Sequence, residues 1–396
     1  MLEVSWITDL TSVSFISSPH RNMISLPQTI AELDTTIDHS PAPIAKLTPF
    51  EQRFAHKSSI YGRVLHIKSL YASYPQVDEI FKTRREAQLS HCASPPLAYR
   101  QSFEKILSKI NHDQDGVFGE DRISRFLDLG FSPGGFSNWL LQSNRKASGV
   151  GITLPDDEAG YQYVAGDLLA TDRFTPVFAN IITSTRDTLS SGGNPIASLI
   201  PGSADGNPSF DLIIGGAFPT LEDKVPWHQR VRLAISQLYI ILSNLQNGGT
   251  AMFLVSTKPR RWQVEILSIF RTLFHSVQSA KGSTHRIRTS CYLICTGFQR
   301  SDKGEMVIEY LQNLRTTLDR LSEIAEEDPL AEGTQRSSTS MPHISGRDDD
   351  VLFEEEHQFT LGLFEPCWKD QYDAIRGHLK RILERDSGRY ILQTLC

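Results

Sequence analysis

The sequence predicts an α/β protein with a mostly parallel sheet and helical extensions at both ends. Between residues 126 and 296, short apolar runs typical of strands alternate with segments whose apolar residues recur at helical spacing. This alternation is typical of a parallel sheet with helices on both faces. A glycine-rich turn follows the first of these runs. Hydrophobic residues make up 39% of the 396-residue chain, which allows a substantial core.

The charge and cysteine content exclude several classes of protein. Lys and Arg total 40, Asp and Glu total 46, and the formal net charge is −6. This excludes a strongly basic nucleic-acid packaging protein, so any nucleic-acid contact must come from a local basic cluster. The five cysteines are scattered apart from Cys291 and Cys295 and form no CxxC, so we expect neither a disulfide framework nor a metal site.

The sequence also bears on the compartment. No run approaches the roughly 20 apolar residues that a membrane span needs, and the first twenty residues do not resemble a signal peptide. We therefore expect an intracellular protein of the cytoplasm or nucleus, without membrane association.

The N-terminal quarter is expected to be accessory to the sheet. Residues 1–48 mix Ser, Thr and Pro with short apolar runs, and we expect a loosely ordered arm. Residues 49–97 form a predicted helical extension, because Phe54, Val64 and Tyr71 belong to a series at helical spacing. A further helix is predicted near residues 98–110.

The region 98–300 contains the predicted sheet. Its strands are expected at residues 126–129, 149–154, 163–165, 210–214, 250–256 and 292–296. The intervening helices are expected at residues 136–141, near 177–188, and at 231–245 and 265–274. Asn247-Gly248-Gly249 is the predicted stop signal of the third of these helices.

The C-terminal hundred residues have a different composition. Residues 301–326 are predicted to hold an acidic amphipathic helix, and residues 327–350 a disordered linker with too few apolar residues to fold. The tail, 351–396, is predicted to be helical, with one apolar helix at 364–384. Because an apolar helix face needs something to pack against, this helix is a candidate site for a protein partner.

The strongest motif is RFLDLGFSPGGFSNWLL, residues 125–141. Glycine is needed where a backbone turns with positive φ or approaches a ligand closely, and the N-terminus of a helix suits a carboxylate. The spacing is neither GxGxxG nor GxxxxGK[ST], which disfavours a dinucleotide site and excludes a P-loop. A tight strand–helix turn without a ligand is the alternative.

This segment resembles motif I of the FtsJ-type (RrmJ-like) ribose 2′-O-methyltransferases, DLGxxPGGFSxxL. Further segments resemble the family in the same order: GVGITLP (149–155), VAGDLL (164–169), FDLIIGGAFP (210–219), SQLYIILSNLQNGGTAMFLV (236–255) and SCYLICTGF (290–298). Of these, GVGITLP is closest to the cap-ribose branch. The resemblance covers about residues 98–300. It implies a Rossmann-like methyltransferase fold that binds S-adenosylmethionine (SAM).

The resemblance also implies which residues bind SAM. The methionine end would be lined by Gly130, Pro133, Gly134 and Gly135, with Phe136 opening the helix that follows. Asp167 would accept the adenine amino group, or else is a solvated loop acid. Asp128 is either part of this site or an acid that stabilises the turn. Asp156 and Asp157 are weak substitutes for the acid that would hold the ribose hydroxyls.

The catalytic side of the family matches poorly. The family uses a Lys-Asp-Lys-Glu tetrad whose first Lys deprotonates the ribose 2′-hydroxyl. The last three positions fall on Gly215 or Gly216, Leu254, and Ser290. Lys105 is the candidate for the first Lys, or is a solvated helix residue. Lys258 lies past the strand end and would reach the site only through a bulge.

Basic clusters near the strand ends are candidates for RNA contact. Arg260, Arg261 and Trp262 form one cluster, and Arg286 and Arg288 another. Arginine with an aromatic ring suits single-stranded RNA, whereas solvated loop charge is the alternative. Two functions remain open: a SAM-dependent RNA methyltransferase, or an inactive SAM-fold protein that binds RNA or a protein. A cavity that holds the tetrad's charges would favour the enzyme.

Overall fold

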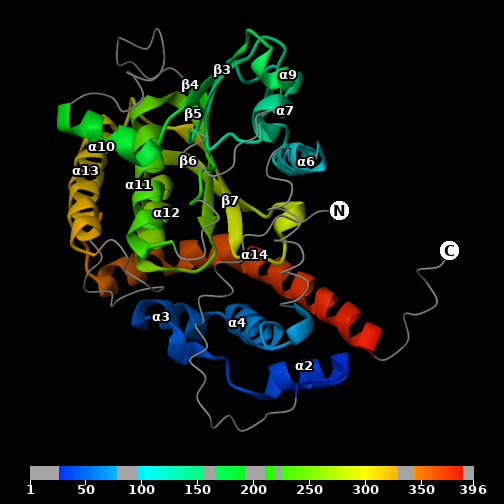
Figure 1. Cartoon of the computed structure of the whole chain (residues 1–396). Helices are drawn as coiled ribbons and strands as arrows, with labels where there is room; N and C mark the ends of the chain where they lie inside the picture. Colours follow the sequence, from blue (N-terminus) through cyan, green and yellow to red (C-terminus); the bar gives the residue numbers. More distant parts are fainter. Residues whose placement is uncertain are drawn as a thin grey trace, which may run out of the picture.

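The computed structural model describes residues 26–77, 97–155, 166–191, 210–219, 225–328 and 343–386. Within these residues the strands are β1 Arg125–Leu129, β2 Ser148–Thr153, β3 Phe174–Phe178, β4 Phe210–Gly215, β5 Leu245–Ser256, β6 Phe274–Ala280 and β7 Ser290–Phe298. They form one sheet in the order β3-β2-β1-β4-β5-β7-β6 (Figure 1). The first five strands are parallel, and β7 runs antiparallel to both β5 and β6. The predicted mostly parallel sheet is confirmed.

Helices cover both faces of this sheet (Figure 1). The helices of this part are α6 Leu97–Asp113, α7 Gly135–Ser143, α9 Gly166–Leu169, α10 Ile181–Ser191, α11 Trp227–Asn244, α12 Arg261–Leu273 and α13 Gly304–Glu327. Side chains of a strand alternate between faces. Phe126 accordingly packs in the cluster under α6 and α7, whereas Leu127 and Leu129 pack in the larger cluster on the opposite face.

The predictions for this region meet the structure unevenly. The predicted strand at 163–165 lies outside the described residues, and strand β3, at Phe174–Phe178 after α9, was not expected. Strand β6 was not expected, because Phe274 continues the helical spacing of α12. The glycines at 248–249 do not end a helix: α11 stops at Asn244, and Gly248, with φ of +77°, lies inside β5.

Part of the predicted N-terminal arm is packed. Residues 1–25 lie outside the described residues, but helix α2, Ile30–His39, is capped by the Thr29 side chain and buries Leu33 completely. Helices α3 Pro49–Lys57 and α4 Ser59–Tyr71 follow, joined to α2 through the short 3-10 turn Ile44–Lys46. The expectation of a loose arm is therefore wrong for 26–48, because the apolar face of α2 packs on α4 and α14.

The C-terminal helix is longer than expected. Helix α14 spans Asp349–Asp386 and lies between the sheet and helices α2–α4 (Figure 1). Its apolar face, predicted to bind a partner, is buried inside the chain: Trp368 stacks on Tyr61 with ring centroids 4.4 Å apart and donates to the Thr257 carbonyl at 2.9 Å. The tail thus packs on the N-terminal helices of its own chain.

The predicted disordered linker is only partly described. Residues 329–342 lie outside the described part of the chain. Residues 343–350 are packed, since Ile344 is buried and Ser345 donates to Glu265 of α12 through both its backbone N–H and its hydroxyl, at 3.0 and 2.8 Å. Among the described helices, none is both long and apolar enough to cross a membrane.

Candidate functional site

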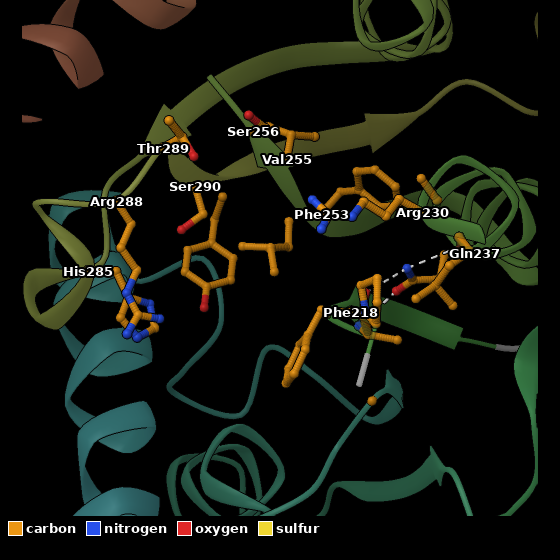
Figure 2. A pocket seen from close by; sticks show the side chains of 18 of the residues that line it. Phe218, Arg230, Gln237, Phe253, Val255, Ser256, His285, Arg288, Thr289 and Ser290 are labelled. Carbon is orange, nitrogen blue, oxygen red and sulfur yellow. Dashed lines mark hydrogen bonds between the residues drawn. The ribbon is translucent and has the colours of Figure 1, made fainter. Parts of the chain in front are cut away.

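A cavity of about 220 Å³ opens at the carboxyl ends of β1, β4 and β5. Ligands of open α/β sheets collect at this edge. The walls come from six segments: helix α6, the turn after β1, the loop after β4, helix α11, the β5–α12 connection, and the residues that lead into β7 (Figure 2). Aromatic rings are frequent among them: Phe103, Phe131, Phe136, Phe218, Phe253, Trp262 and Tyr292.

The turn after β1 is shaped by packing against the loop after β4. Gly130 has φ of +84°, and a Cβ there would lie 2.5 Å from the Cα of Ala217, so only glycine fits. The Gly216 N–H donates to the Leu129 carbonyl at 3.0 Å and ties the two segments together. Of the predicted methionine-end residues, Gly130, Pro133 and Gly135 line the cavity, as does Phe136.

Gly134 has a different role from its neighbours. It is the N-cap of α7, with φ of +96°, and a Cβ there would meet Leu168 at 2.6 Å. It is not among the residues that line the cavity. Glycine is required at position 134 because the backbone has a positive φ there and because Leu168 of α9 leaves no room for a Cβ.

Asp128 combines both roles that the sequence left open. It lines the cavity, and its carboxylate accepts a hydrogen bond from the Ser137 hydroxyl at 2.7 Å and another from the Ser137 backbone N–H. It thereby caps the first turn of α7. Burial raises the pKa of Asp128 to about 7, because a buried carboxylate is disfavoured; the Ser137 bonds oppose this shift.

Asp167 lies away from the cavity lining. Both of its oxygens accept hydrogen bonds from the Arg100 guanidinium, at 2.7 and 2.9 Å. These bonds lower the pKa of Asp167, although its side chain is 63% exposed. It is therefore a largely solvated acid that pairs with Arg100, and it is not among the residues that line the cavity. Asp156 and Asp157 lie outside the described residues.

The tetrad positions implied by the resemblance meet on one wall. Gly216, Leu254 and Ser290 all line the cavity. Gly215 does not: a Cβ there would lie 2.5 Å from the Phe253 ring. Lys105 is exposed on α6 and, like Lys258, is not among the lining residues. No lysine therefore belongs to the described lining.

The charged groups on the cavity wall are mostly arginines. Arg230, Arg260 and Arg288 line it together with His285, and Asp128 is the one acid among the described lining residues. Burial, with the positive charges of Arg288 and Lys281 nearby, holds the pKa of His285 well below its usual value, so its imidazole is neutral near pH 7.

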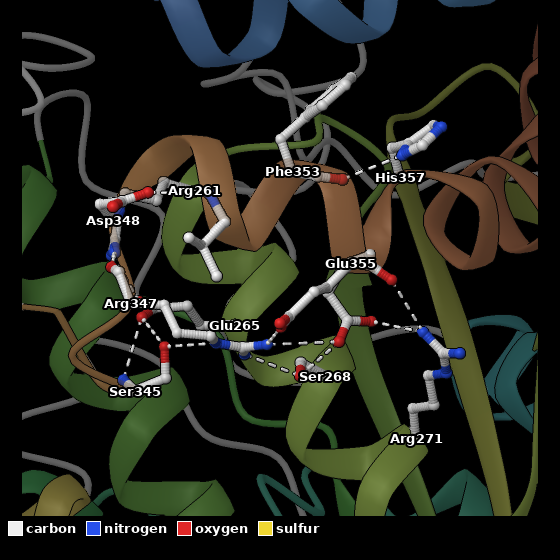
Figure 3. A network of polar contacts seen from close by, with 12 residues as sticks. Arg261, Glu265, Ser268, Arg271, Ser345, Arg347, Asp348, Phe353, Glu355 and His357 are labelled. Carbon is white, nitrogen blue, oxygen red and sulfur yellow. Dashed lines mark hydrogen bonds and ion pairs between the residues drawn. The ribbon is translucent and has the colours of Figure 1, made fainter.

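The candidate RNA-contacting residues divide into two groups. Arg260, Trp262 and Arg288 line the cavity. The expectation is wrong for Arg261, which is 4% exposed and pairs with Glu265 and Asp349 at 2.8 and 2.6 Å (Figure 3). Arg286 is likewise held by Asp370 of α14. The ion pairs with Asp349 and Asp370 connect α14 to helix α12 and to the loop that precedes β7.

Gln237 braces the cavity and was not expected from the sequence. Its Oε1 accepts from the Ala217 N–H at 2.9 Å, and its Nε2 donates to the Ala217 carbonyl at 3.0 Å (Figure 2). It is 3% exposed on the mostly apolar inner face of α11. An amide among apolar residues is the only signal that the sequence offers for this role.

The cavity lining combines aromatic rings with arginines and one acid, groups that suit a ligand with aromatic and charged parts. The described part of the chain contains no group of three or more His, Cys, Asp and Glu placed to hold a metal ion. Aromatic walls, arginines and one protonatable acid remain.

One of the comparisons with known proteins identifies a family. Residues 103–298 match the family model described as FtsJ-like methyltransferase. No curated protein matches the chain. Solved structures that resemble it include a ribosomal RNA methyltransferase from Plasmodium falciparum, with 16% identity over 48% of this chain and 94% of that one and a TM-score of 0.35. A second is human methyltransferase-like protein 13 in complex with SAH, with 11% identity, 61% and 96% coverage and a TM-score of 0.33. A third is the fibrillarin pre-rRNA processing protein of Methanococcus jannaschii, with 11% identity, 45% and 68% coverage and a TM-score of 0.28.

Proposed function

Since residues 103–298 form an FtsJ-like methyltransferase domain, we propose that the protein binds SAM and RNA but has lost most of the capacity to methylate a ribose 2′-hydroxyl. One observation carries the proposal. Gly216, Leu254 and Ser290, the cavity residues at three tetrad positions, have no ionisable side chain.

The residues around the turn fit the amino-acid end of SAM. Asp128 offers a carboxylate to an ammonium group. The N-cap of α7 is Gly134, which has no side chain of its own to cap the helix, and a helix N-terminus suits a carboxylate. When bound, SAM supplies an electrophilic methyl group on its sulfonium. The adenine end fits less closely, because Arg100 already occupies both oxygens of Asp167.

The loss of activity follows from the missing groups. Removing a positioned general base typically lowers a rate by about 10²–10⁴, and removing one electrostatic stabiliser by about 10²–10³. None of Gly216, Leu254 and Ser290 can hold charge or accept a proton from a hydroxyl near pH 7. Positioning of SAM against a ribose would remain and would support slow transfer.

The cations of the cavity support binding of RNA. Arg260 and Arg288 can neutralise phosphates, and Trp262 offers a face on which a base can stack. Because the lining holds three arginines against one acid, a polyanion is favoured over a neutral ligand.

Two measurements on the full chain test this proposal. Calorimetric titration with SAM and with SAH should give saturable binding, while tritiated methyl transfer onto total RNA should be far slower than about 1 s⁻¹. Lys105→Ala is the matched control and should change neither result, because Lys105 is exposed outside the cavity. Absence of SAM binding would overturn the cofactor assignment. Turnover near 1 s⁻¹ would overturn the loss of activity.

A further inference from the structure

Two thiols lie together where α14 packs on the sheet, outside the cavity lining. Cys291 begins the buried part of β7 and is 1% exposed; Cys367 of α14 is 3% exposed. The Cys367 thiol donates to the Ser279 hydroxyl of β6 at 3.5 Å. Ser279 pairs with Leu293 across the β6–β7 ladder, so Ser279, Leu293 and Cys291 share the face that α14 covers.

A buried lysine completes this cluster. Lys281 follows β6 and donates its ammonium protons to the carbonyls of Arg288 and Ser290, the latter at 3.0 Å. Its charge acts on both thiols. The cluster therefore contains two sulfur atoms, a hydroxyl and a cation, drawn from α14, β6 and β7.

The two thiols differ in protonation. The adjacent Cys291 thiol, together with the charge of Lys281, lowers the pKa of Cys367 to about 7. The adjacent Cys367 and burial raise the pKa of Cys291. Cys367 thus ionises more readily than Cys291 near neutral pH. Cys295, further along β7, has its pKa raised by burial alone.

We propose that Cys291 and Cys367 form a redox modification site at which a hydroperoxide produces a disulfide between β7 and α14. The geometry carries this assignment: Cys367 contacts Ser279 of β6, and Cys291 lies on the same covered face of the adjacent strand β7. The Lys281 ammonium lies beside them, bonded to the Ser290 carbonyl. It does not depend on SAM or RNA binding.

The reaction balances with hydrogen peroxide as the oxidant. The Cys367 thiolate attacks one peroxide oxygen, the O–O bond breaks, and sulfenic acid and hydroxide form. The Cys291 sulfur then attacks the Cys367 sulfur, the S–S bond forms, and the departing hydroxyl leaves as water. In sum, two thiols lose two electrons and two protons, and one peroxide becomes two waters.

The bridge would connect the C-terminal helix to the cavity. Ser290, the neighbour of Cys291, lines the cavity. Trp368, the neighbour of Cys367, bonds to Thr257 at the end of β5. Oxidation would therefore fasten α14 to the strands that form one wall of the site.

Peptide mapping of the oxidised full chain tests the proposal without any variant. After treatment with hydrogen peroxide and blocking of free thiols, mass spectrometry should find a Cys291–Cys367 cross-linked peptide that reductant removes. Because the bridge closes a long loop, the oxidised protein should melt at least about 3 °C higher than the reduced protein.

Two variants sharpen the result. Cys367→Ala should abolish the cross-link and the rise in melting temperature, whereas the matched control Cys295→Ala should keep both. The proposal is overturned if folded wild-type protein forms no Cys291–Cys367 peptide while other thiols oxidise. It is equally overturned if Cys291 pairs with Cys295 instead.

Discussion

Gly216 and Gly215 provide the sharpest test of the site, because they are adjacent and the structure gives them opposite properties. A Cβ on Gly216 would lie 3.5 Å from the Leu129 carbonyl and 3.6 Å from Ile214, which is ordinary contact. A Cβ on Gly215 would lie 2.5 and 2.9 Å from two carbons of the Phe253 ring. Only Gly216 lines the cavity.

These distances determine how much an aspartate at each position should change the free energy of unfolding. Gly216→Asp should leave the free energy of unfolding within about 1 kcal/mol of wild type, as for a change that fills open space. Gly215→Asp overpacks the core, at about 1–3 kcal/mol, and buries a carboxylate without a partner, which costs several more. With roughly 2–4 °C per kcal/mol, its melting temperature should fall by about 6 °C or more.

The activity assay uses the same pair. Gly216→Asp combined with Leu254→Lys and Ser290→Glu should raise tritiated methyl transfer onto RNA by about 10² or more, because three of the four charged groups of the tetrad are restored. The same combination built on Gly215→Asp should gain nothing. Our reasoning fails if the Gly215 version is as stable as wild type, or if it is the one that gains activity.

Further predictions concern individual side chains. Asp128→Asn should weaken SAM binding at least about tenfold in calorimetry, through loss of an ionic hydrogen bond. Because the pKa of Asp128 is raised from 3.8 to about 7, the folded protein binds more protons than the unfolded chain between these values. Wild-type stability in urea should therefore fall more steeply from pH 4 to 7 than that of Asp128→Asn. Gln237→Ala should cost about 1–3 kcal/mol in denaturant unfolding, because Ala217 loses buried partners; an unchanged stability would show that the brace is unimportant. Arg260→Ala should weaken RNA binding and reduce its salt slope by about 1. Arg261→Ala should instead destabilise the fold by about 3–5 kcal/mol, since it leaves Glu265 buried and unpaired. A reversal of these two arginine results would mean that the wrong side chain faces the ligand.

The sequence alone determined the sheet and its most local motif. Strand β1, the turn and α7 follow one another within residues 125–143, so their apolar periodicity and glycine spacing are visible in a short window. The lack of ionisable side chains at Gly216, Leu254 and Ser290 was also visible in the sequence, because it depends on residue type alone. Such properties depend on residue type and spacing, and these are present in the chain before it folds.

Only the tertiary structure decided which remote residues contact each of these side chains. Only the packing of Phe253 distinguishes Gly215 from Gly216, and only the position of Asp349 removes Arg261 from the RNA candidates. The face of α14 that looked available for a partner is covered by Tyr61, hundreds of residues earlier. A local pattern records that a side chain is apolar or charged, but not which remote group meets it. Partner choice depends on long-range contacts that form only when the whole chain is packed.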